Sequence, residues 1–497
     1  MYLPIADVIS RLNLDTGYIS GGGCIDFSPV NGKEIASFPF HDSEQVRKAV
    51  KLSVQAFTEW ENVSPDVKTD LIRTFANELR ENTDDLARLI AAETGKIMTD
   101  ALREVKKSID VCNYVSSLPQ RLTGLSAPTE SNGLSLMETW LPIGPVAVIT
   151  PFNLPLRVWT LHAMLALACG NPVIWRPSRK TVLTAFAANS LLRRAMAKLD
   201  AACPEYLSQL IICDRKDAAV FAENPDVALL CATGSPENVR TLAATTGARG
   251  GRSLISSGGN NSAVITPDAD IDAAVKHLVR GTIIDCGQQC TAFQRLFCHS
   301  SVYDEVVGKL KRGLELIYVN SPFERQTEIG PLIDKESFDA MNAALNAAKS
   351  EGGKVFGGER LLIGGYDNAY YVHPALVEMP EQTDTVKKEL LAPVLFVMKY
   401  DSLPDAVSRV NEVPKSLISA IFSNNIKETG YFLSVNGVKS NVATVNAGSV
   451  GYDLVAMFGN NRSGGSSSSE IWHSYMRSKT CLINYNFQPQ TCCASLL

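Results

Sequence analysis

The chain lacks the features that mark proteins acting on nucleic acids or membranes. Its 497 residues carry 47 basic and 52 acidic side chains, a formal net charge of −5, and no basic run with interleaved aromatic residues. That balance argues against a general nucleic-acid binder. An apolar stretch at residues 161–174 is interrupted by His162, Gly170, Asn171 and Pro172, and it is too short to cross a bilayer. Neither nucleic acid nor a membrane is therefore expected as a partner.

Signals for disulfides, metal sites and secretion are also missing. The 12 cysteines are spread at irregular spacings through a long chain, unlike a short disulfide scaffold. Cys286 with Cys290, and Cys492 with Cys493, do not give the paired CxxC spacing of a structural zinc site, so no metal is expected. No positively charged segment followed by an apolar one begins at Met1, so no signal peptide is expected. The predicted location is the cytoplasm.

What the chain does contain is an alternation of short apolar strands with helical patterns. Its length exceeds what one hydrophobic core usually organises, so two or more domains are expected. Strands alternating with helices predict a parallel, doubly wound sheet that binds ligands at the carboxyl ends of its strands. The five strands predicted for this sheet are residues 146–149, 172–175, 209–213, 227–230 and 263–265.

Polar residues follow several of these strands. Asn153 follows the first, where its amide can donate to a developing oxyanion, although a plain proline-bounded turn is the simpler alternative. Arg176 follows the second strand and can face a nucleotide. Residues 233–235 follow the fourth and open a helix, whose N–H groups favour phosphate; ordinary capping by Ser235 is the alternative. The usual GxGxxG dinucleotide fingerprint is absent.

The clearest candidate for chemistry lies at residues 285–291, which read DCGQQCT. The stretch separates a helix-like run at 273–284 from a strand-like run at 296–299. A thiol beside glycine and glutamine at such a junction can be reached by a substrate, and a thiolate attacks carbonyl carbons. Most intracellular cysteines are small buried hydrophobes, so Cys286 or Cys290 is catalytic only if other parts of the chain support that role.

Taken in order, the motifs resemble those of the aldehyde dehydrogenase superfamily over nearly the whole chain. They are PFN at 151–153, GNPVIWRPS at 170–178, TGS at 233–235, GGNN at 258–261, DAD at 268–270, GQQCT at 287–291, ELLAP at 389–393 and FG at 458–459. Three segments are similar to the aminoadipate-semialdehyde, or antiquitin-like, branch: GGNN, YMR at 475–477 and TCLINY at 480–485.

The resemblance implies an α/β fold with a Rossmann-type cofactor domain, an α/β catalytic domain and a small β oligomerisation arm. It implies a homodimer or homotetramer, in which the strands expected at 134–141 and 480–485 exchange between subunits because each would be an exposed edge in a monomer. The expected boundaries are 1–120 and 143–255 for the nucleotide-binding domain, 256–455 for the catalytic domain, and 121–142 and 474–497 for the arm.

The resemblance also implies roles for individual residues. Cys290 is the expected nucleophile, and Asn153 with the Cys290 backbone N–H forms the expected oxyanion hole. The cofactor is NAD or NADP and the substrate a small aldehyde. The expected cofactor contacts are Thr150, Pro151, Phe152, Arg176, Ser178, Arg179, Gly234, Ser235, Glu389 and Leu391. Substrate contacts are expected from Gln289 and Thr291, and also from Arg157, Trp159 and Phe293, for which surface charge or ordinary packing is the alternative.

The chain departs from the family pattern at several positions. Ser256 stands where the family has its general-base glutamate, and a serine hydroxyl has no useful basicity near pH 7. Val239 stands where a second glycine is expected after Gly234. Gln289 stands where the aminoadipate branch has arginine before the nucleophile. Residues 466–470 read SSSSE where the family has Gly-Arg-Glu.

Three functions follow from this pattern. The first is NAD(P)-dependent oxidation of a semialdehyde or other small aldehyde through a thiohemiacetal and a thioester on Cys290. The second forms or reduces a thioester without hydrolysis and passes the acyl group to a thiol acceptor such as coenzyme A. Family members that transfer acyl groups to coenzyme A typically lack the glutamate base, which fits Ser256. The third is a catalytically weak homologue that binds nucleotide or a partner. Retention of Cys290, Asn153 and Glu389 argues against complete loss of activity.

The turn after the second strand indicates which cofactor is preferred. Enzymes that select NAD place an acidic side chain on the adenine ribose, which repels a 2′-phosphate. Residues 176–180 read RPSRK and contain no acid. Guanidinium groups of Arg176 and Arg179 suit phosphate geometry, and Lys180 adds positive charge. NADP is therefore expected to bind at least as well as NAD, the alternative being that Arg179 and Lys180 only begin a solvated helix.

Overall fold

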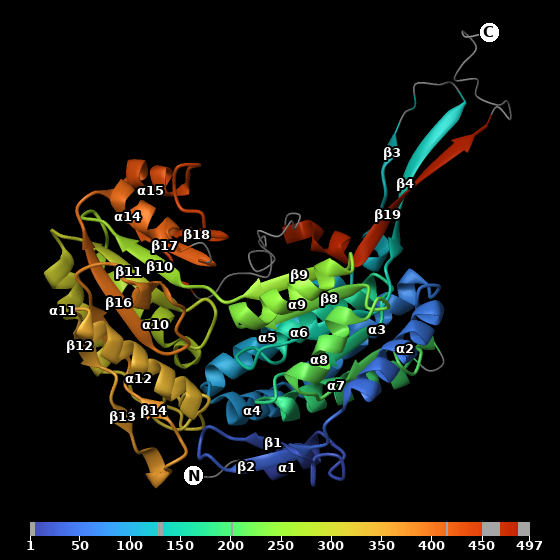
Figure 1. The fold of residues 1–497 in the computed structure, drawn as a ribbon, viewed down its shortest axis with the longest axis horizontal. Helices are drawn as coiled ribbons and strands as arrows, with labels where there is room; N and C mark the ends of the chain where they lie inside the picture. The colour runs from blue at the N-terminus through green and yellow to red at the C-terminus, as the bar shows by residue number, and fades with distance from the viewer. Residues whose placement is uncertain are drawn as a thin grey trace.

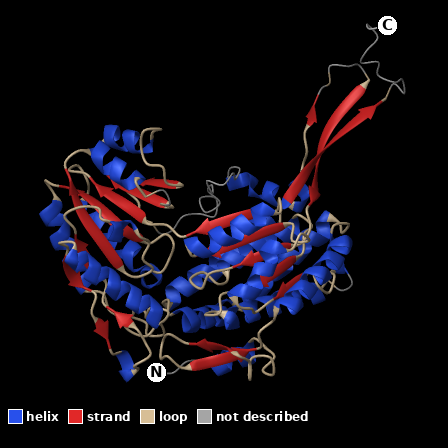
Figure 2. Ribbon diagram, viewed as in Figure 1, coloured by secondary structure: helices blue, strands red, loops and turns tan. Residues whose placement is uncertain are grey.

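A computed structural model describes residues 5–127, 129, 133–199, 202–413, 416–449 and 468–485. Figure 1 shows two α/β bodies side by side and a thin β arm that projects from one of them. Figure 2 shows that helices cover the sheets of both bodies, whereas the arm is made of strands. The α/β fold expected from the sequence is confirmed.

The first body is built on a five-stranded parallel sheet with the order β7-β6-β5-β8-β9. The order reverses between β5 and β8, and in such sheets ligands bind at the carboxyl ends of the strands near that reversal. The strands are β5 (Val146–Ile149), β6 (Val173–Arg176), β7 (Ser208–Leu210), β8 (Leu229–Gly234) and β9 (Arg252–Ser257).

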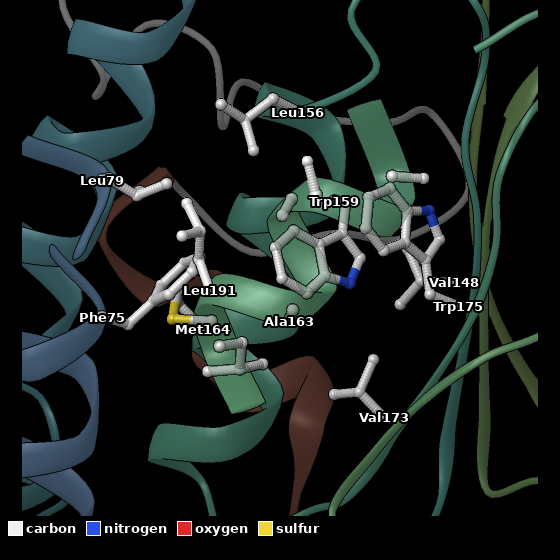
Figure 3. Packing of buried hydrophobic residues seen from close by; sticks show 14 of the residues in the cluster. Phe75, Leu79, Val148, Leu156, Trp159, Ala163, Met164, Val173, Trp175 and Leu191 are labelled. Carbon is white, nitrogen blue, oxygen red and sulfur yellow. The ribbon is translucent and has the colours of Figure 1, made fainter. Parts of the chain in front are cut away.

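Helices pack on both faces of this sheet, and an antiparallel pair of strands lies beside it. A stack of aromatic rings joins helix to strand: the rings of Trp159 and Trp175 lie 4.3 Å apart and nearly parallel, and Phe75 meets Trp159 edge-on (Figure 3). The helices and the strand pair are α1 (Ile5–Arg11), α2 (Ser43–Trp60), α3 (Pro65–Glu81), α4 (Thr83–Thr94), α5 (Met98–Val115), α6 (Arg157–Ala168), α7 (Val182–Ala197), α8 (Arg215–Glu223), α9 (Pro236–Ala248), β1 (Cys24–Phe27) and β2 (Glu34–Phe38).

The second body has a seven-stranded sheet, β12-β15-β16-β11-β10-β17-β18, in which only β12 runs antiparallel to its neighbour. Its strands are β10 (Asn261–Ile265), β11 (Phe293–His299), β12 (Lys354–Gly357), β15 (Ala375–Glu378), β16 (Val394–Tyr400), β17 (Ile418–Phe422) and β18 (Val442–Val445). Its longer helices are α10 (Ile271–Ile283), α11 (Tyr303–Glu315), α12 (Lys335–Ser350), α14 (Leu403–Asn411) and α15 (Ile426–Leu433).

One strand was assigned to the wrong sheet. Residues 263–265 were predicted as the fifth strand of the first sheet, but β10 lies in the second sheet between β11 and β17. The fifth strand of the first sheet is β9, whose sequence RSLISS has too few apolar residues to stand out as a buried strand. Its side chains are only partly covered because β9 is an edge strand.

The arm is a three-stranded antiparallel sheet, β19-β4-β3. β4 (Leu134–Pro142) pairs along its length with β19 (Met476–Asn484) and on its other side with β3 (Ser126–Ala127). The expectation that residues 134–141 form an exposed edge is therefore wrong, because β4 is the middle strand. The edge is β19, which carries the segment predicted at 480–485 and is exposed at most positions.

The projecting arm is expected to join subunits. Leu482 is 59% exposed and Tyr485 61%, and apolar side chains on an open strand edge favour pairing with another chain. Light scattering at micromolar concentration is expected to give at least a dimer, and Leu482→Glu with Ile483→Glu is expected to shift it toward monomer. A native protein that is monomeric at that concentration would contradict this assignment.

No helix in the part of the chain that the structure describes is both long and apolar enough to cross a membrane.

Candidate active site

The loop before Cys290 has an unusual backbone. It follows α10 through a short turn, η3 (Ile284–Gly287), in which Asp285 has φ +48° and Cys286 has φ +58°. Side-chain-bearing residues rarely adopt this left-handed conformation, and they keep it only where surrounding contacts impose it. Gly287 follows with φ +69°, and a Cβ there would lie 2.3 Å from the carbonyl carbon of Ala392. A glycine is required at that position.

Asn261 fixes the backbone on the other side of the nucleophile. Its buried amide nitrogen donates to the carbonyl oxygens of Cys290, at 2.8 Å, and Ala292, at 2.9 Å. Its amide oxygen accepts from the backbone N–H groups of Leu417 and Ile418 at the start of β17. The GGNN motif therefore sets the position of Cys290 against the second sheet.

The structure brings Asn153 to the nucleophile loop although 137 residues separate it from Cys290. Asn153 is 7% exposed, and its amide nitrogen donates to the carbonyl oxygen of Gln288 at 2.7 Å. Gln288 is itself fixed, because its side-chain oxygen accepts from the backbone N–H of Ile333. An amide nitrogen carries two hydrogens, so Asn153 keeps a second N–H for another acceptor.

A buried lysine joins these two loops. Lys96 is 2% exposed, and its ammonium group donates to the Asn153 carbonyl oxygen at 2.6 Å and to Glu104 at 2.7 Å, and lies 3.3 Å from Asp285. The other oxygen of Glu104 accepts from the backbone N–H of Arg157 in the first turn of α6. Burial raises the pKa of Asp285 to about 6, against the opposing effect of Lys96.

Cys290 and Cys286 differ in access. Cys290 is half-buried, whereas Cys286 is 2% exposed. Burial first, and the negative charge of Glu389 second, raise the pKa of the Cys290 thiol to about 11, while Arg157 opposes the shift. Burial raises the pKa of Cys286 further. The accessible thiol is therefore the one that the sequence motif selects.

Alkylation by iodoacetamide is expected to label Cys290 and leave Cys286 unmodified, as peptide mass spectrometry would show. Because the thiolate is the reactive form and the folded pKa is about 11, the labelling rate should rise about tenfold per pH unit from pH 7 to 10. Glu389→Gln should speed labelling at pH 8, since that charge raises the pKa. Preferential labelling of Cys286 would contradict the assignment.

Glu389 lies against the GGNN segment. A Cβ on Gly258 would fall 1.8 Å from a carboxylate oxygen of Glu389, so only glycine leaves room for this side chain. The following residue is fixed by Gln294, which donates to the Leu390 carbonyl at 2.7 Å and accepts from its N–H. Leu391 is half-buried beside it. The carboxylate expected at the cofactor ribose therefore lies near Cys290.

The residues expected at the cofactor end of the sheet lie together after β5 and β6. Arg176 donates to the Cys213 carbonyl at 3.0 Å, and its buried Nε has no hydrogen-bond partner among the described residues. Arg179 pairs with Asp214 at 2.8 Å, so an acid reaches this turn from another segment. The Thr150 hydroxyl oxygen accepts a hydrogen bond from the buried indole of Trp175 at 2.9 Å, so this oxygen is engaged within the protein interior.

Other expected cofactor residues have local partners. Ser178 accepts from the backbone N–H of Lys180, whose ammonium lies 5.4 Å from the ring of the half-buried Phe152. Pro151 is half-buried beside Phe152.

The start of α9 fits a phosphate group. Gly234 ends β8, and Ser235 precedes the helix without capping it, since its hydroxyl instead accepts from Asn238 at 2.7 Å. The first N–H groups of the 13-residue helix thus keep no capping side chain, which suits an anion. Val239, at the expected glycine position, is 2% exposed and packs into the core.

Two of the expected substrate residues lie in hydrophobic cores instead. Trp159 is fully buried in the stack of Figure 3, and Phe293 is 1% exposed at the start of β11. Packing, the alternative interpretation, holds for both. Gln289 donates to Asp285 at 3.0 Å and accepts from the Thr291 hydroxyl at 2.7 Å, so both flank Cys290 and stabilise its loop.

Ser256 lies at the carboxyl end of β9, exposed and opposite Thr233 of β8. The FG motif at 458–459, Ser466 and Ser467, Cys492 and Cys493 lie outside the described residues.

Sequence reasoning missed Lys96, Glu104 and Gln294, which carry no motif of their own. The only sequence signal for these three residues was a charged or amide side chain within a segment otherwise expected to be buried.

A parallel β7-β6-β5-β8-β9 sheet whose carboxyl edge meets a fixed, cysteine-bearing loop is typical of α/β enzymes that bind a ligand at that edge. The chain belongs to the aldehyde dehydrogenase family: the family profile described as "Aldehyde dehydrogenase family" matches residues 22–481. The resemblance inferred from the motifs is confirmed.

Relatives and solved structures agree with that assignment. The chain is 31% identical over 461 residues to aldehyde dehydrogenase family 7 member B4 of Arabidopsis thaliana, covering 92% of this chain and 90% of that protein. It is 30% identical over 465 residues to alpha-aminoadipic semialdehyde dehydrogenase of Bos taurus, covering 93% and 85%. The fold is similar to that of betaine aldehyde dehydrogenase of Staphylococcus aureus in complex with NAD+, with a TM-score of 0.87, 23% identity and 94% of each chain covered.

Proposed function

We propose that the protein oxidises a semialdehyde or other small aldehyde with NAD or NADP through a covalent intermediate on Cys290. The observation that carries the proposal is the meeting of Cys290, Asn153 and Glu389 at the carboxyl edge of the first sheet, linked by the Asn153 to Gln288 bond of 2.7 Å. Arg176, Ser178, Ser235 and Glu389 would hold the dinucleotide, whose nicotinamide ring supplies a hydride acceptor when bound.

The residues of the chain perform the covalent steps. The Cys290 thiolate adds to the aldehyde carbon and forms a thiohemiacetal, which becomes a thioester on oxidation. The oxyanion that forms on addition is stabilised by the second N–H of Asn153 and by the Cys290 backbone N–H. Lys96 and Asn261 hold these donors in position from opposite sides.

Ser256 favours a second route for the last step. Hydrolysis of the thioester needs a base for the attacking water, and the exposed Ser256 hydroxyl cannot take that proton near pH 7. Transfer of the acyl group to a thiol acceptor such as coenzyme A needs no such base on the protein. We infer that hydrolysis is slow and that a thiol acceptor is the alternative fate of the thioester.

Burst kinetics test these routes. Mixing the protein with NAD(P)+ and an aldehyde is expected to give a burst of reduced cofactor equal to the number of Cys290 sites, followed by slow turnover. Coenzyme A relieves the slow phase if acyl transfer is the natural route. Fast acid formation at many turnovers would show that another base serves. Nucleotide binding without a burst, the behaviour of a catalytically weak homologue, would overturn the proposal.

We expect the protein to bind NADP at least as tightly as it binds NAD. Arg176 remains near the turn after β6, whereas Arg179 pairs with Asp214 and Lys180 pairs with Asp334 and lies 3.7 Å from Glu336. Asp214→Asn should therefore strengthen NADP binding relative to NAD, and Arg179→Glu should weaken it. Titration at fixed ionic strength measures both dissociation constants, and NAD binding tighter by tenfold, about 1.4 kcal/mol, would contradict the preference.

We also propose the cytoplasm as the location of the protein.

A further inference from the structure

Both peptide groups that flank Glu389 are hydrogen-bonded to buried side chains. The carbonyl oxygen of Lys388 belongs to the peptide group before Glu389, and it accepts from the amide nitrogen of Asn260 at 3.1 Å. The N–H of Leu390 belongs to the peptide group after it, and it donates to the side-chain oxygen of Gln294 at 3.0 Å. Peptide groups are planar, so two fixed ones set the direction in which the Glu389 side chain leaves the backbone.

The same two side chains make further bonds to this segment. Asn260 also donates to the carbonyl oxygen of Val386, at 2.7 Å, in the short helix α13 (Asp384–Lys387). Gln294 also donates to the Leu390 carbonyl oxygen at 2.7 Å. Asn260 and Gln294 are each 2% exposed, so these bonds are shielded from water, and a group left unpaired there would be costly.

A buried arginine fixes which way the Asn260 amide points. Arg295 is fully buried; its Nε donates to the Asn260 side-chain oxygen at 2.7 Å and its Nη2 to the Asn260 backbone oxygen at 2.9 Å. A guanidinium can only donate, so it holds the oxygen end of the amide. The nitrogen end of Asn260 must therefore face the carbonyl groups beside Glu389.

The other acceptors of Arg295 among the described residues are neutral as well. Its Nη1 donates to the Gln382 side-chain oxygen at 2.7 Å, and longer contacts reach the carbonyl oxygens of Arg409 and Val410. Burial lowers the pKa of Arg295 to about 9, and Glu412 opposes that shift. A buried cation with neutral partners is weak evidence for stability, and it fits a role in orienting the groups that it binds.

We propose that Arg295, Asn260 and Gln294 are positioning residues for a single carboxylate, which they hold toward the ribose hydroxyl groups of the cofactor. The carboxylate is that of Glu389, and the three residues together form a clamp on its segment. The Glu389 side chain lies over Gly258, two residues before Asn260, where a Cβ would fall 1.8 Å from a carboxylate oxygen. This inference rests on the proposed function, because it explains how the same cofactor site is oriented.

Asn260→Asp removes the donors of the clamp but keeps its acceptor. One oxygen of the new carboxylate still accepts from Arg295, now as an ion pair, whereas the other faces the carbonyl oxygens of Val386 and Lys388 and repels them. The midpoint of urea unfolding should therefore stay close to that of the native protein. The dissociation constants of NAD+ and NADP+, measured by calorimetry, should rise about tenfold, or about 1.4 kcal/mol.

The matched control is Asn411→Asp, in the same body. Asn411 donates to the carbonyl oxygen of Gly437 at 3.0 Å and accepts from the N–H of Lys439 at 2.9 Å, so the same substitution removes one amide donor without touching the clamp. Cofactor binding should be unchanged in this variant. An equal rise of the dissociation constants in both variants, or no rise in Asn260→Asp, would overturn the proposal.

A double-mutant cycle separates positioning of Glu389 from a general structural effect. If Asn260 acts through Glu389, Asn260→Asp should weaken cofactor binding little further once Glu389→Gln has removed the carboxylate charge. Coupled residues give such non-additive effects, whereas independent ones add. Additive losses in the double variant would contradict the clamp.

Hydrogen exchange provides a readout that needs no cofactor. Gln294→Met leaves the Leu390 N–H without its acceptor, and Asn260→Asp loosens the peptide groups before it. In both variants the peptide that covers residues 386–390 should exchange about tenfold faster, with no change there in Asn411→Asp. Unchanged exchange would overturn the clamp. A native protein that binds neither NAD+ nor NADP+ would refute the proposed function, while exchange would still decide on the clamp; should Asn260→Asp fail to fold, Gln294→Met gives both readouts.

Discussion

Replacing Ser256 by glutamate is expected to raise the multiple-turnover rate of acid formation by about two to four orders of magnitude, the usual contribution of a general base. Ser256 is the next-to-last residue of β9 and is exposed, so a longer charged side chain there does not bury an unpaired carboxylate. The measurement is steady-state acid release with saturating aldehyde and cofactor, compared with the size of the initial burst.

Two controls accompany this variant. Ser257→Glu places the same charge one residue further along β9, on the opposite face of the strand, and should not speed hydrolysis. Glu389→Gln tests whether the native protein already uses that carboxylate as a substitute base; Glu470 is a further candidate whose side chain lies outside the described residues. A native enzyme that turns over quickly, with Ser256→Glu no faster, would show that Ser256 is not a missing base.

Lys96→Met is expected to destabilise the protein by about 3–5 kcal/mol, the cost of removing one partner from a buried ion pair. Glu104 and Asp285 would remain buried without the ammonium group that lies 2.7 and 3.3 Å from them. Removing Lys96 should also slow the burst of reduced cofactor that accompanies acylation of Cys290, because Lys96 joins the Asn153 carbonyl to the nucleophile loop. Urea unfolding gives the free energy, and stopped-flow absorbance the burst.

The destabilisation caused by Lys96→Met is expected to change with pH in one direction. The folded pKa of Asp285, about 6, lies above its ordinary value of 3.8, so this carboxyl favours folding below pH 4 and costs stability as the pH rises through 6. The destabilisation by Lys96→Met should therefore be smaller at pH 5 than at pH 8. Lys335→Met, which breaks an exposed pair with Asp339, should leave the unfolding free energy unchanged. Equal effects of the two variants would contradict a special role for Lys96.

Much of this architecture could be predicted from the sequence because its signals are local. The strands β5, β6 and β8 are short apolar runs, and the residues at their ends, Asn153 and Arg176, lie where parallel strands place ligand contacts. β9 was missed because an edge strand of mixed composition carries no buried periodicity. β4 was expected at an edge because a partner strand 340 residues away, seen in the Thr139 to Lys479 contact, leaves no trace in local pattern.

The site was less predictable where its parts depend on distant contacts. Cys290 was selected over Cys286 by motif, but the pKa of about 11 arises from burial and from Glu389, nearly 100 residues later. Lys96 ends up among Glu104, Asn153 and Asp285 only after two bodies pack together. Trp159 was misplaced because a tryptophan near Asn153 in sequence can point either into the core or toward a ligand, and the spacing does not distinguish the two.

The central claim is that Cys290 carries the acyl group during aldehyde oxidation. Its most direct test is to quench the protein a few seconds after mixing with NAD(P)+ and a small aldehyde, and to map the adduct by peptide mass spectrometry. The expected result is one acyl group on the peptide that contains residues 285–291, assigned by fragmentation to Cys290 and absent in Cys290→Ala. An adduct on Cys286, or reduced cofactor formed with no acylated cysteine, would contradict the account.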